Sequence, residues 1–246
     1  MPLGDLVHWG SDFLGGQGTA AAIDAAGIQC FGVGTETYGS TVDESGGISA
    51  NATGANDNDN FVMRSGPFAP RDGKITLRAR FKYSNVDCAI FVGFTETLDT
   101  TTPVMPAEYA TSTMTYNGTG GMVGFNYDAD GSTDDFRAVM GDGGAAISDS
   151  SSGTRASATL TADRWFEAVV ILNEDGTAEC WLGDSGHAFS DNTLKTRLIK
   201  RFSTGTLLTT TDLFFACLMI ENRTGNARTL ETDYFMGNAG RDWRFN

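Results

Sequence analysis

The stretch WFEAVVILNEDGTAECWL, residues 165–182, decides the fold. Two apolar runs flank the letters NEDG, and an Asp-Gly pair between such runs is a strong short-range signal of a β-hairpin. A second stretch, TLRARFKY at 76–83, alternates apolar residues with polar or charged ones. That period of two is typical of a strand with one face on the core and one in water. Both stretches predict antiparallel strands.

The rest of the chain repeats this pattern with little sign of helix. Near-continuous apolar runs at Ala89–Phe94 and Leu213–Ile220 predict strands that are covered on both faces. Gly121–Tyr127 and Thr229–Phe235 predict two further strands. Only residues 20–26 suggest a short helix, and glycines lie close to it. Many short strands separated by turn residues predict an all-β fold, a two-sheet antiparallel β-sandwich of the jelly-roll type.

The expected organisation is one domain with an arm. A chain of 246 residues is a normal length for a single sandwich, and neither a repeat nor a shift in composition divides it. Residues 1–20 are rich in glycine and carry isolated aromatic residues, including Trp9 and Phe13, so we expect an irregular N-terminal arm there. Residues 21–246 are expected to form the single jelly-roll domain.

The net charge, the first residues and the cysteines indicate which partners to expect and whether the chain is secreted. The formal net charge of −14 repels nucleic acid and anionic membrane surfaces, so we expect neither as a partner. The start, MPLGDLVHWGSDF, lacks the basic and apolar regions of a secretion signal, so none is expected. The four scattered cysteines are expected to be buried free thiols, with one or two disulfides as the alternative: Cys30, Cys88, Cys180 and Cys217.

The sequence shows no catalytic constellation. The two histidines, His8 and His187, lie in irregular segments without a Gly-x-Ser-x-Gly elbow. Glu231 and Asp233 share a strand face, but the Glu-x-Asp-x-x-Glu pattern of one family of sandwich glucanases needs a second glutamate where Met236 stands. We therefore expect no catalytic residues and no enzymatic activity.

Metal and cofactor sites are not expected either. DADGSTDDF, residues 128–136, begins like a calcium loop, but Ser132 and Val139 stand where an EF-hand needs ligands. A solvated acidic turn is the better prediction, and a weak calcium site of another geometry is the alternative. ANATGANDND at 50–59 likewise predicts a turn between two strands. We interpret three Asn-x-Thr matches as chance matches: Asn51, Asn117 and Asn222.

Motifs spread over nearly the whole chain carry a resemblance. They are WGSDFLGG, GGIS followed by TGANDNDNFVM, FVGFTET, WFEAVVILNEDGTAECWLGD and LFFACLMIENRTGNARTLETDYF. In these strand and turn patterns the chain resembles the concanavalin A-like (laminin-G-like) jelly-roll virion proteins of tailed bacteriophages. The resemblance implies a non-enzymatic viral structural protein, made in the host cytoplasm and located on the capsid surface of the virion.

Within that class, the resemblance favours a capsid decoration or cement protein. It would bind and stabilise the head shell through the major capsid protein or another virion protein, as a homo-oligomer with a trimer favoured. The alternatives are a glycan-binding module or a tail or fibre adhesin with the same fold, with a glycan as partner, and then a polysaccharide hydrolase. Trp9 or Trp243 is the candidate aromatic residue for glycan contact.

Basic and aromatic residues are the candidates for partner binding. Two segments oppose the acidic average, TLRARFKY and KTRLIKRF, and we expect one to dock on an acidic capsid surface while aromatic residues of the arm insert beside it. The alternative is a charged face that only protects a sheet edge. The candidates are Trp9, Phe13, Arg78, Arg80, Lys82, Lys195, Arg197, Lys200 and Arg201.

Overall fold

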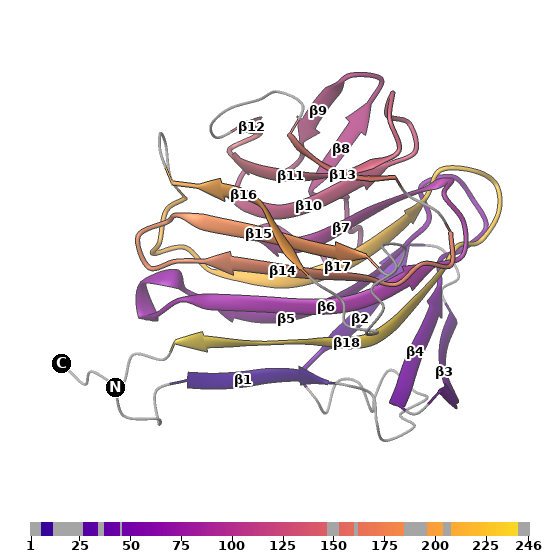
Figure 1. Ribbon diagram of the computed structural model, residues 1–246, viewed down its shortest axis with the longest axis horizontal. Coiled ribbons are helices and arrows are strands. Elements are labelled where there is room, and N and C mark those ends of the chain that lie inside the picture. The colour runs from indigo at the N-terminus through magenta and orange to yellow at the C-terminus, as the bar shows by residue number, and fades with distance from the viewer. Residues whose placement is uncertain are drawn as a thin grey trace.

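The computed structural model of the protein describes residues 6–11, 27–33, 37–44, 46–146, 153–159, 162–184, 196–203 and 208–240. Two antiparallel sheets stack face to face, and a small hairpin lies beside one of them (Figure 1). The predicted all-β sandwich is confirmed. No helix among the described residues is long and apolar enough to cross a membrane.

The first sheet has eight strands in the order β16-β15-β14-β6-β18-β4-β3, with β1 paired to β18. The predicted hairpin forms β14 and β15, and a positive φ of 79° at Gly176 closes its turn. The bounds are β1 (Leu6–Ser11), β3 (Thr37–Glu44), β4 (Gly46–Ala52), β6 (Ile75–Tyr83), β14 (Phe166–Leu172), β15 (Ala178–Asp184), β16 (Arg197–Phe202) and β18 (Thr229–Gly240).

The second sheet also has eight strands, in the order β12-β11-β10-β7-β17-β5-β2, with β13 paired to β11. The apolar runs predicted as doubly covered strands form β7 and β17, which lie next to each other inside this sheet. The bounds are β2 (Gln29–Val33), β5 (Asn60–Phe68), β7 (Cys88–Thr95), β10 (Met122–Asp128), β11 (Asp135–Asp142), β12 (Ala145–Ala146), β13 (Thr154–Thr159) and β17 (Phe214–Asn222).

The segment between β4 and β5 forms the expected turn, but it connects the two sheets rather than two paired strands. Asp59 fixes it, because its Oδ2 accepts hydrogen bonds from the backbone N–H of Asn56 at 2.9 Å and from the Asn56 side chain at 3.0 Å. A short 3-10 helix, η1 (Pro70–Asp72), connects β5 to β6. The helix suggested for residues 20–26 lies outside the described residues.

The main core lies between the two sheets and is rich in aromatic rings. Phe136 of β11 is central to it, with ring centroids 5.2 Å from Phe166, 5.9 Å from Tyr127 and 6.0 Å from Phe81. Three of the four cysteines are buried free thiols, as expected, whereas Cys30 is only half-buried. The apolar face of TLRARFKY, with Phe81 and Tyr83, lies in this core, as its alternation predicts.

A second core covers the outer face of the second sheet. The hairpin of β8 (Ala107–Ala110) and β9 (Thr113–Tyr116) lies over this face beside β10 and β11 (Figure 1). Tyr109 and Tyr116 lie directly over Gly131 and Gly141, where any Cβ would overlap the rings. The hairpin is thus packed on the sheet and brings Glu108 to its rim.

The expected irregular arm is wrong for its described part. Residues Leu6–Ser11 form β1, which pairs with β18 along its whole length. The indole of Trp9 is half-buried and packs against the main core, 5.5 Å from the ring of Phe68 and 5.4 Å from that of Phe235. The correction has a physical cause: one apolar anchor and a free strand edge are enough to order this segment.

Trp9→Ala is therefore expected to lower the free energy of unfolding of the isolated protein, by about 2–4 kcal/mol, because it removes a packed indole and leaves a cavity. His8→Ala is the matched control, since the neighbouring His8 side chain is exposed. Urea unfolding followed by fluorescence and circular dichroism measures both variants. Equal stability of the two variants would contradict the packing role of Trp9.

Candidate functional site

The basic residues of β6 lie on the outer face of the first sheet, where each has an acidic partner. Arg78 pairs with Glu167 of β14, and Arg80 pairs with Asp233 of β18. Lys82 pairs with Glu231, at 2.9 Å from Nζ to Oε2. Hydrogen bonding to Glu167 raises the pKa of Arg78, so this cation stays charged. Glu231 and Asp233, the candidate carboxylate pair, are thus held by cations.

The remaining candidates for partner binding do not gather with these three. Arg201 pairs with Glu179 at 2.8 Å, and Lys200 lies over the ring of Phe202. Arg197 donates to the backbone carbonyl of Ala156. Lys195, Phe13, His187 and Trp243 lie outside the described residues, and Trp9 packs against the main core. Docking by the basic residues stays a prediction.

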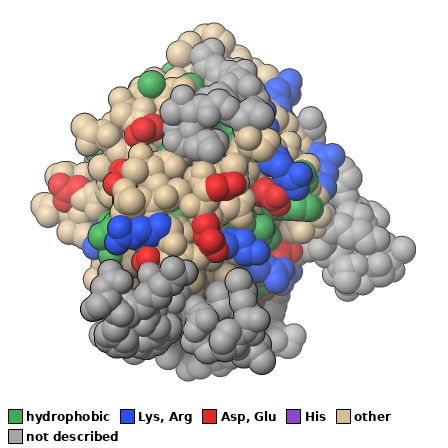
Figure 2. All heavy atoms as spheres, turned by 90° about the vertical axis from the view of Figure 1, so that its left-hand side faces the viewer, with side chains coloured by type: hydrophobic (Ala, Val, Ile, Leu, Met, Phe, Trp, Pro, Cys, Tyr) green, Lys and Arg blue, Asp and Glu red, His purple; other side chains and the backbone are tan. Residues whose placement is uncertain are grey.

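On the face of the molecule that Figure 2 shows, blue and red side chains lie next to each other. Such interspersed charge does not present a field of one sign to a partner. Where such ion pairs are solvent-exposed, each contributes little to stability, about 0–1 kcal/mol. A stronger arrangement of charges lies at one end of the second sheet.

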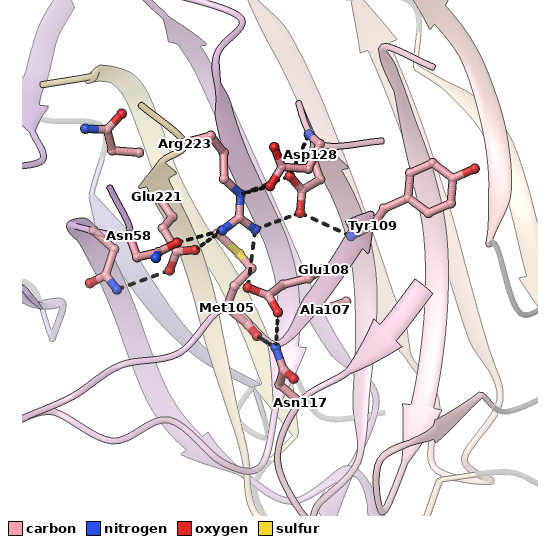
Figure 3. A network of polar contacts seen from close by, with 12 residues as sticks. Asn58, Met105, Ala107, Glu108, Tyr109, Asn117, Asp128, Glu221 and Arg223 are labelled. Atoms are coloured by element: carbon pink, nitrogen blue, oxygen red, sulfur yellow. Dashed lines mark hydrogen bonds and ion pairs between the residues drawn. The ribbon is translucent and has the colours of Figure 1, made fainter. Parts of the chain in front are cut away.

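A cluster centred on Arg223 forms at the end of the second sheet where β10 and β17 finish. We call it the Arg223 cluster and define it as Asn58, Glu108, Asp128, Asp130, Glu221 and Arg223. Figure 3 shows carboxylate groups of Asp128, Glu221 and Glu108 directed at the guanidinium group. The side chains of Arg223, Asp128 and Glu221 are 7%, 1% and 6% exposed, so this is a buried ion network.

The strand register explains why these residues meet. Asp128 of β10 and Glu221 of β17 both lie beside Ala89 of β7, the strand between them. Arg223 directly follows β17, and its side chain reaches both carboxylates above the small side chain at position 89. Glu108 arrives from β8, which packs on β10. Four chain segments thus converge on one guanidinium.

Asp128 makes the closest set of contacts with Arg223. Its Oδ1 accepts from Nε at 3.0 Å and its Oδ2 from Nη2 at 2.7 Å, the fork geometry that gives strong charge-assisted hydrogen bonds. The same carboxylate accepts from the backbone N–H groups of Tyr109 at 3.1 Å and Asp130 at 3.2 Å. The expected solvated acidic turn is therefore wrong for Asp128, because a buried cation and two N–H groups compensate its burial.

The outer contacts complete the network. Nη1 of Arg223 donates to Glu221 Oε1 at 2.6 Å and to Asn58 Oδ1 at 3.1 Å, and Nη2 donates to Glu108 Oε1 at 3.3 Å. The other oxygen of Glu108 accepts from Asn117 Nδ2 at 3.0 Å. The side chains of Glu108 and Asp130 are 34% and 60% exposed. They form a polar rim around the buried centre.

The three Asn-x-Thr matches take structural roles. Asn51 and Asn222 are buried, and Asn222 Oδ1 accepts from the backbone N–H of Thr224 at 3.0 Å. Asn117 Nδ2 donates to Met105 O and to Glu108. The folded protein therefore does not present the Asn51 and Asn222 amides for modification.

Electrostatics differ between the two buried partners of Arg223. Burial alone would lower the pKa of Arg223, but Asp128, Glu221 and Glu108 outweigh it, so the net pKa is raised and the guanidinium stays charged. Burial raises the pKa of Glu221 to about 7, although Arg223 and Asn60 act in the opposite direction. Glu108 and Asp128 reinforce the rise by repulsion. Glu221 thus titrates near neutral pH.

This pKa predicts how stability changes with pH. Folded Glu221 holds its proton more tightly than the unfolded chain, so its contribution is full below about pH 4.5 and is lost as pH rises through about 7. The free energy of unfolding should fall by about 2–3 kcal/mol at most from this group between about pH 5 and about pH 8. Urea unfolding at a series of pH values should show a flatter profile for Glu221→Gln than for the wild type. Glu231→Gln, the control, should keep the wild-type slope; equal slopes in all three proteins would refute the prediction.

Comparisons with known proteins give the fold. No protein-family model and no curated protein sequence matches the chain. A protein of unknown function, SO2946 from Shewanella oneidensis MR-1, matches with a TM-score of 0.60 and 13% identity, over 98% of this chain and 90% of that one. Peanut lectin with a 9-mer peptide matches with a TM-score of 0.56 and 13% identity, over 96% and 97%.

The exoplasmic/lumenal domain of VIP36, in its Ca2+/Man2-bound form, matches with a TM-score of 0.53 and 10% identity, over 97% of this chain and 89% of that domain. Identities this low establish the fold alone, which is the concanavalin A-like β-sandwich of lectins. The fold part of the sequence resemblance is confirmed. Nothing in these likenesses indicates a virion protein, so the capsid role, its trimer and its location stay predictions.

Sequence reasoning missed the Arg223 cluster, although one signal was present. Along β17, Cys217, Met219 and Glu221 alternate onto the same buried face, and along β10 Asp128 ends a strand that is buried throughout. A carboxylate in line with a buried apolar row requires a cation nearby. The partner could not be chosen from sequence, because Arg223 and Arg228 both follow β17 closely.

Proposed function

We propose that the protein is a non-enzymatic glycan-binding module. The observation that carries the proposal is the likeness to peanut lectin, which covers 96% of this chain and 97% of the lectin, so the whole described architecture is shared rather than one sheet. The VIP36 domain, solved with Man2, supports the same class. A shared fold does not determine function by itself, so the proposal also needs a site.

The Arg223 cluster supplies the site. Its rim offers the carboxylates of Glu108 and Asp130 as acceptors for sugar hydroxyl groups, and Asn58 lies exposed beside them. Carboxylates and amides are the groups that bind hydroxyl-rich ligands most directionally. Arg223 holds Glu108 in place before any ligand arrives, which lowers the entropy cost of binding.

The test is a glycan-array screen with the wild-type protein, followed by calorimetric titration of the best ligand. Asp130→Asn and Glu108→Gln keep side-chain shape and remove charge, and each should weaken binding by roughly tenfold or more, since a hydrogen bond to a charged group contributes about 1.5–3 kcal/mol. The melting temperature of each variant shows whether the fold is intact.

Glu174→Gln is the matched control. Glu174 is exposed in the β14–β15 turn, which follows Leu172, and Leu172 pairs with Ile75 at the start of β6. The Arg223 cluster lies at the other end of the sandwich, near Asp87, which follows β6. The control should bind as the wild type does. A glycan ligand whose affinity is the same in all four proteins would remove the Arg223 cluster from the site.

A further inference from the structure

The Arg223 guanidinium lies inside a cage of oxygen atoms. Within 3.3 Å of its nitrogens lie both oxygens of Asp128 and one oxygen each from Glu221, Asn58 and Glu108. Asp130 adds a carboxylate oxygen at 3.7 Å from Nε. These oxygens come from four segments that are far apart in sequence, and the guanidinium connects all four through hydrogen bonds.

A cage of carboxylate and amide oxygens is the usual donor set for a hard cation such as Ca2+, which takes 6–8 oxygen ligands at about 2.3–2.6 Å. The VIP36 domain with this fold was solved with Ca2+ bound. In this protein the donor set does not fit a metal ion, because the cage oxygens already accept hydrogen bonds from Arg223. While Arg223 separates the carboxylates of the cage, the described residues contain no group of three or more His, Cys, Asp or Glu side chains arranged to hold a metal.

We propose that the Arg223 guanidinium replaces a bound metal ion as the central cation of this cage. It orders the loops of the rim, and the protein binds its ligand without a metal ion. The ordering of the rim by Arg223 concerns the protein alone. Ligand binding without a metal ion rests on the proposed glycan function. Arginine suits this role, because its planar fork stays charged and its five donors satisfy several acceptors at once.

The decisive variant is Arg223→Ala, which leaves the carboxylates of Asp128 and Glu221 buried beside an open space. The melting temperature should fall by roughly 10 °C or more, since an unpaired buried charge is among the most destabilising changes known. Addition of about 1 mM Ca2+ should then raise it by roughly 5 °C through binding to the vacated cage. Calorimetry should show one Ca2+ site in Arg223→Ala and none in the wild type.

Two further variants test whether the response to Ca2+ comes from the cage or from the loss of any arginine. Arg223→Ala combined with Asp128→Asn should lose the response to Ca2+, because the central ligand is weakened. Arg197→Ala, which removes an exposed arginine of β16, should neither lower the melting temperature comparably nor gain a Ca2+ site. If Arg223→Ala is recovered only as aggregate, refolding it and Arg223→Gln with and without Ca2+ gives the same answer, with folded protein expected only when Ca2+ is present.

Three results would overturn the inference. They are a wild-type protein that binds Ca2+ and loses that binding in Asp128→Asn, an Arg223→Ala protein that does not respond to Ca2+, or variants that stay unfolded with Ca2+. Glycan titration of the wild type with and without EDTA tests whether the ligand binds without a metal ion, and equal affinities are expected. If no glycan binds, the proposed function fails, while the Ca2+ results still decide the role of Arg223.

Discussion

A chain that ends at Arg228 will not fold. The deletion removes β18, which lies inside the first sheet and pairs with β6, with β4 and with β1. It also removes Leu230 and Phe235 from the main core, where both are fully buried. Losing a central strand exposes two sheet edges and costs more than the roughly 5–15 kcal/mol by which a native domain is stable.

A chain that ends at Gly240 is the matched control, because it keeps every described strand. Far-UV circular dichroism and thermal melting of both proteins measure the outcome. The control should melt cooperatively, whereas the shorter chain should show no cooperative transition. A shorter chain that melted as the wild type does would show that the assigned position of β18 is wrong.

Asp128→Ala should destabilise the protein by about 3–5 kcal/mol, the cost of breaking a buried ion pair from one side. The change leaves Arg223 without its bidentate carboxylate partner and removes the acceptor for the backbone N–H groups of Tyr109 and Asp130. Asp134→Ala, six residues further on, is the control, since Asp134 is exposed and should cost less than about 0.5 kcal/mol. Chemical unfolding of the two variants at one pH measures the difference. A cost of less than about 1 kcal/mol for Asp128→Ala would show that the network does not stabilise the fold.

The strands were largely predictable because local chemistry determines them. The alternation in TLRARFKY fixes which side chains of β6 face the core, and Asp-Gly fixes the β14–β15 turn. The apolar runs became β7 and β17, each buried on both faces because the β8–β9 hairpin covers one of them. The pairing of β4 and β5 with different sheets did not follow from local pattern, since a turn sequence does not show where the next strand pairs.

The candidate site was much less predictable. Arg78, Arg80 and Lys82 were correctly placed on one strand face, but their partners come from β14 and β18, which are distant in sequence. Trp9 looked like an exposed anchor because it lies in a glycine-rich segment, and only the pairing of β1 with β18 shows that it packs against the core. The Arg223 cluster depends on four segments meeting, which requires the sheet register.

Under the proposed function, the protein binds a glycan at the Arg223 cluster. Chemical-shift mapping by NMR, with the strongest ligand from a glycan array added to isotope-labelled wild-type protein, tests this most directly. We expect saturable shifts at Asn58, Glu108, Asp130 and Arg223, and none at Glu174. Shifts confined to Arg78, Arg80 and Lys82 on the first sheet, or no shift with any glycan, would contradict it.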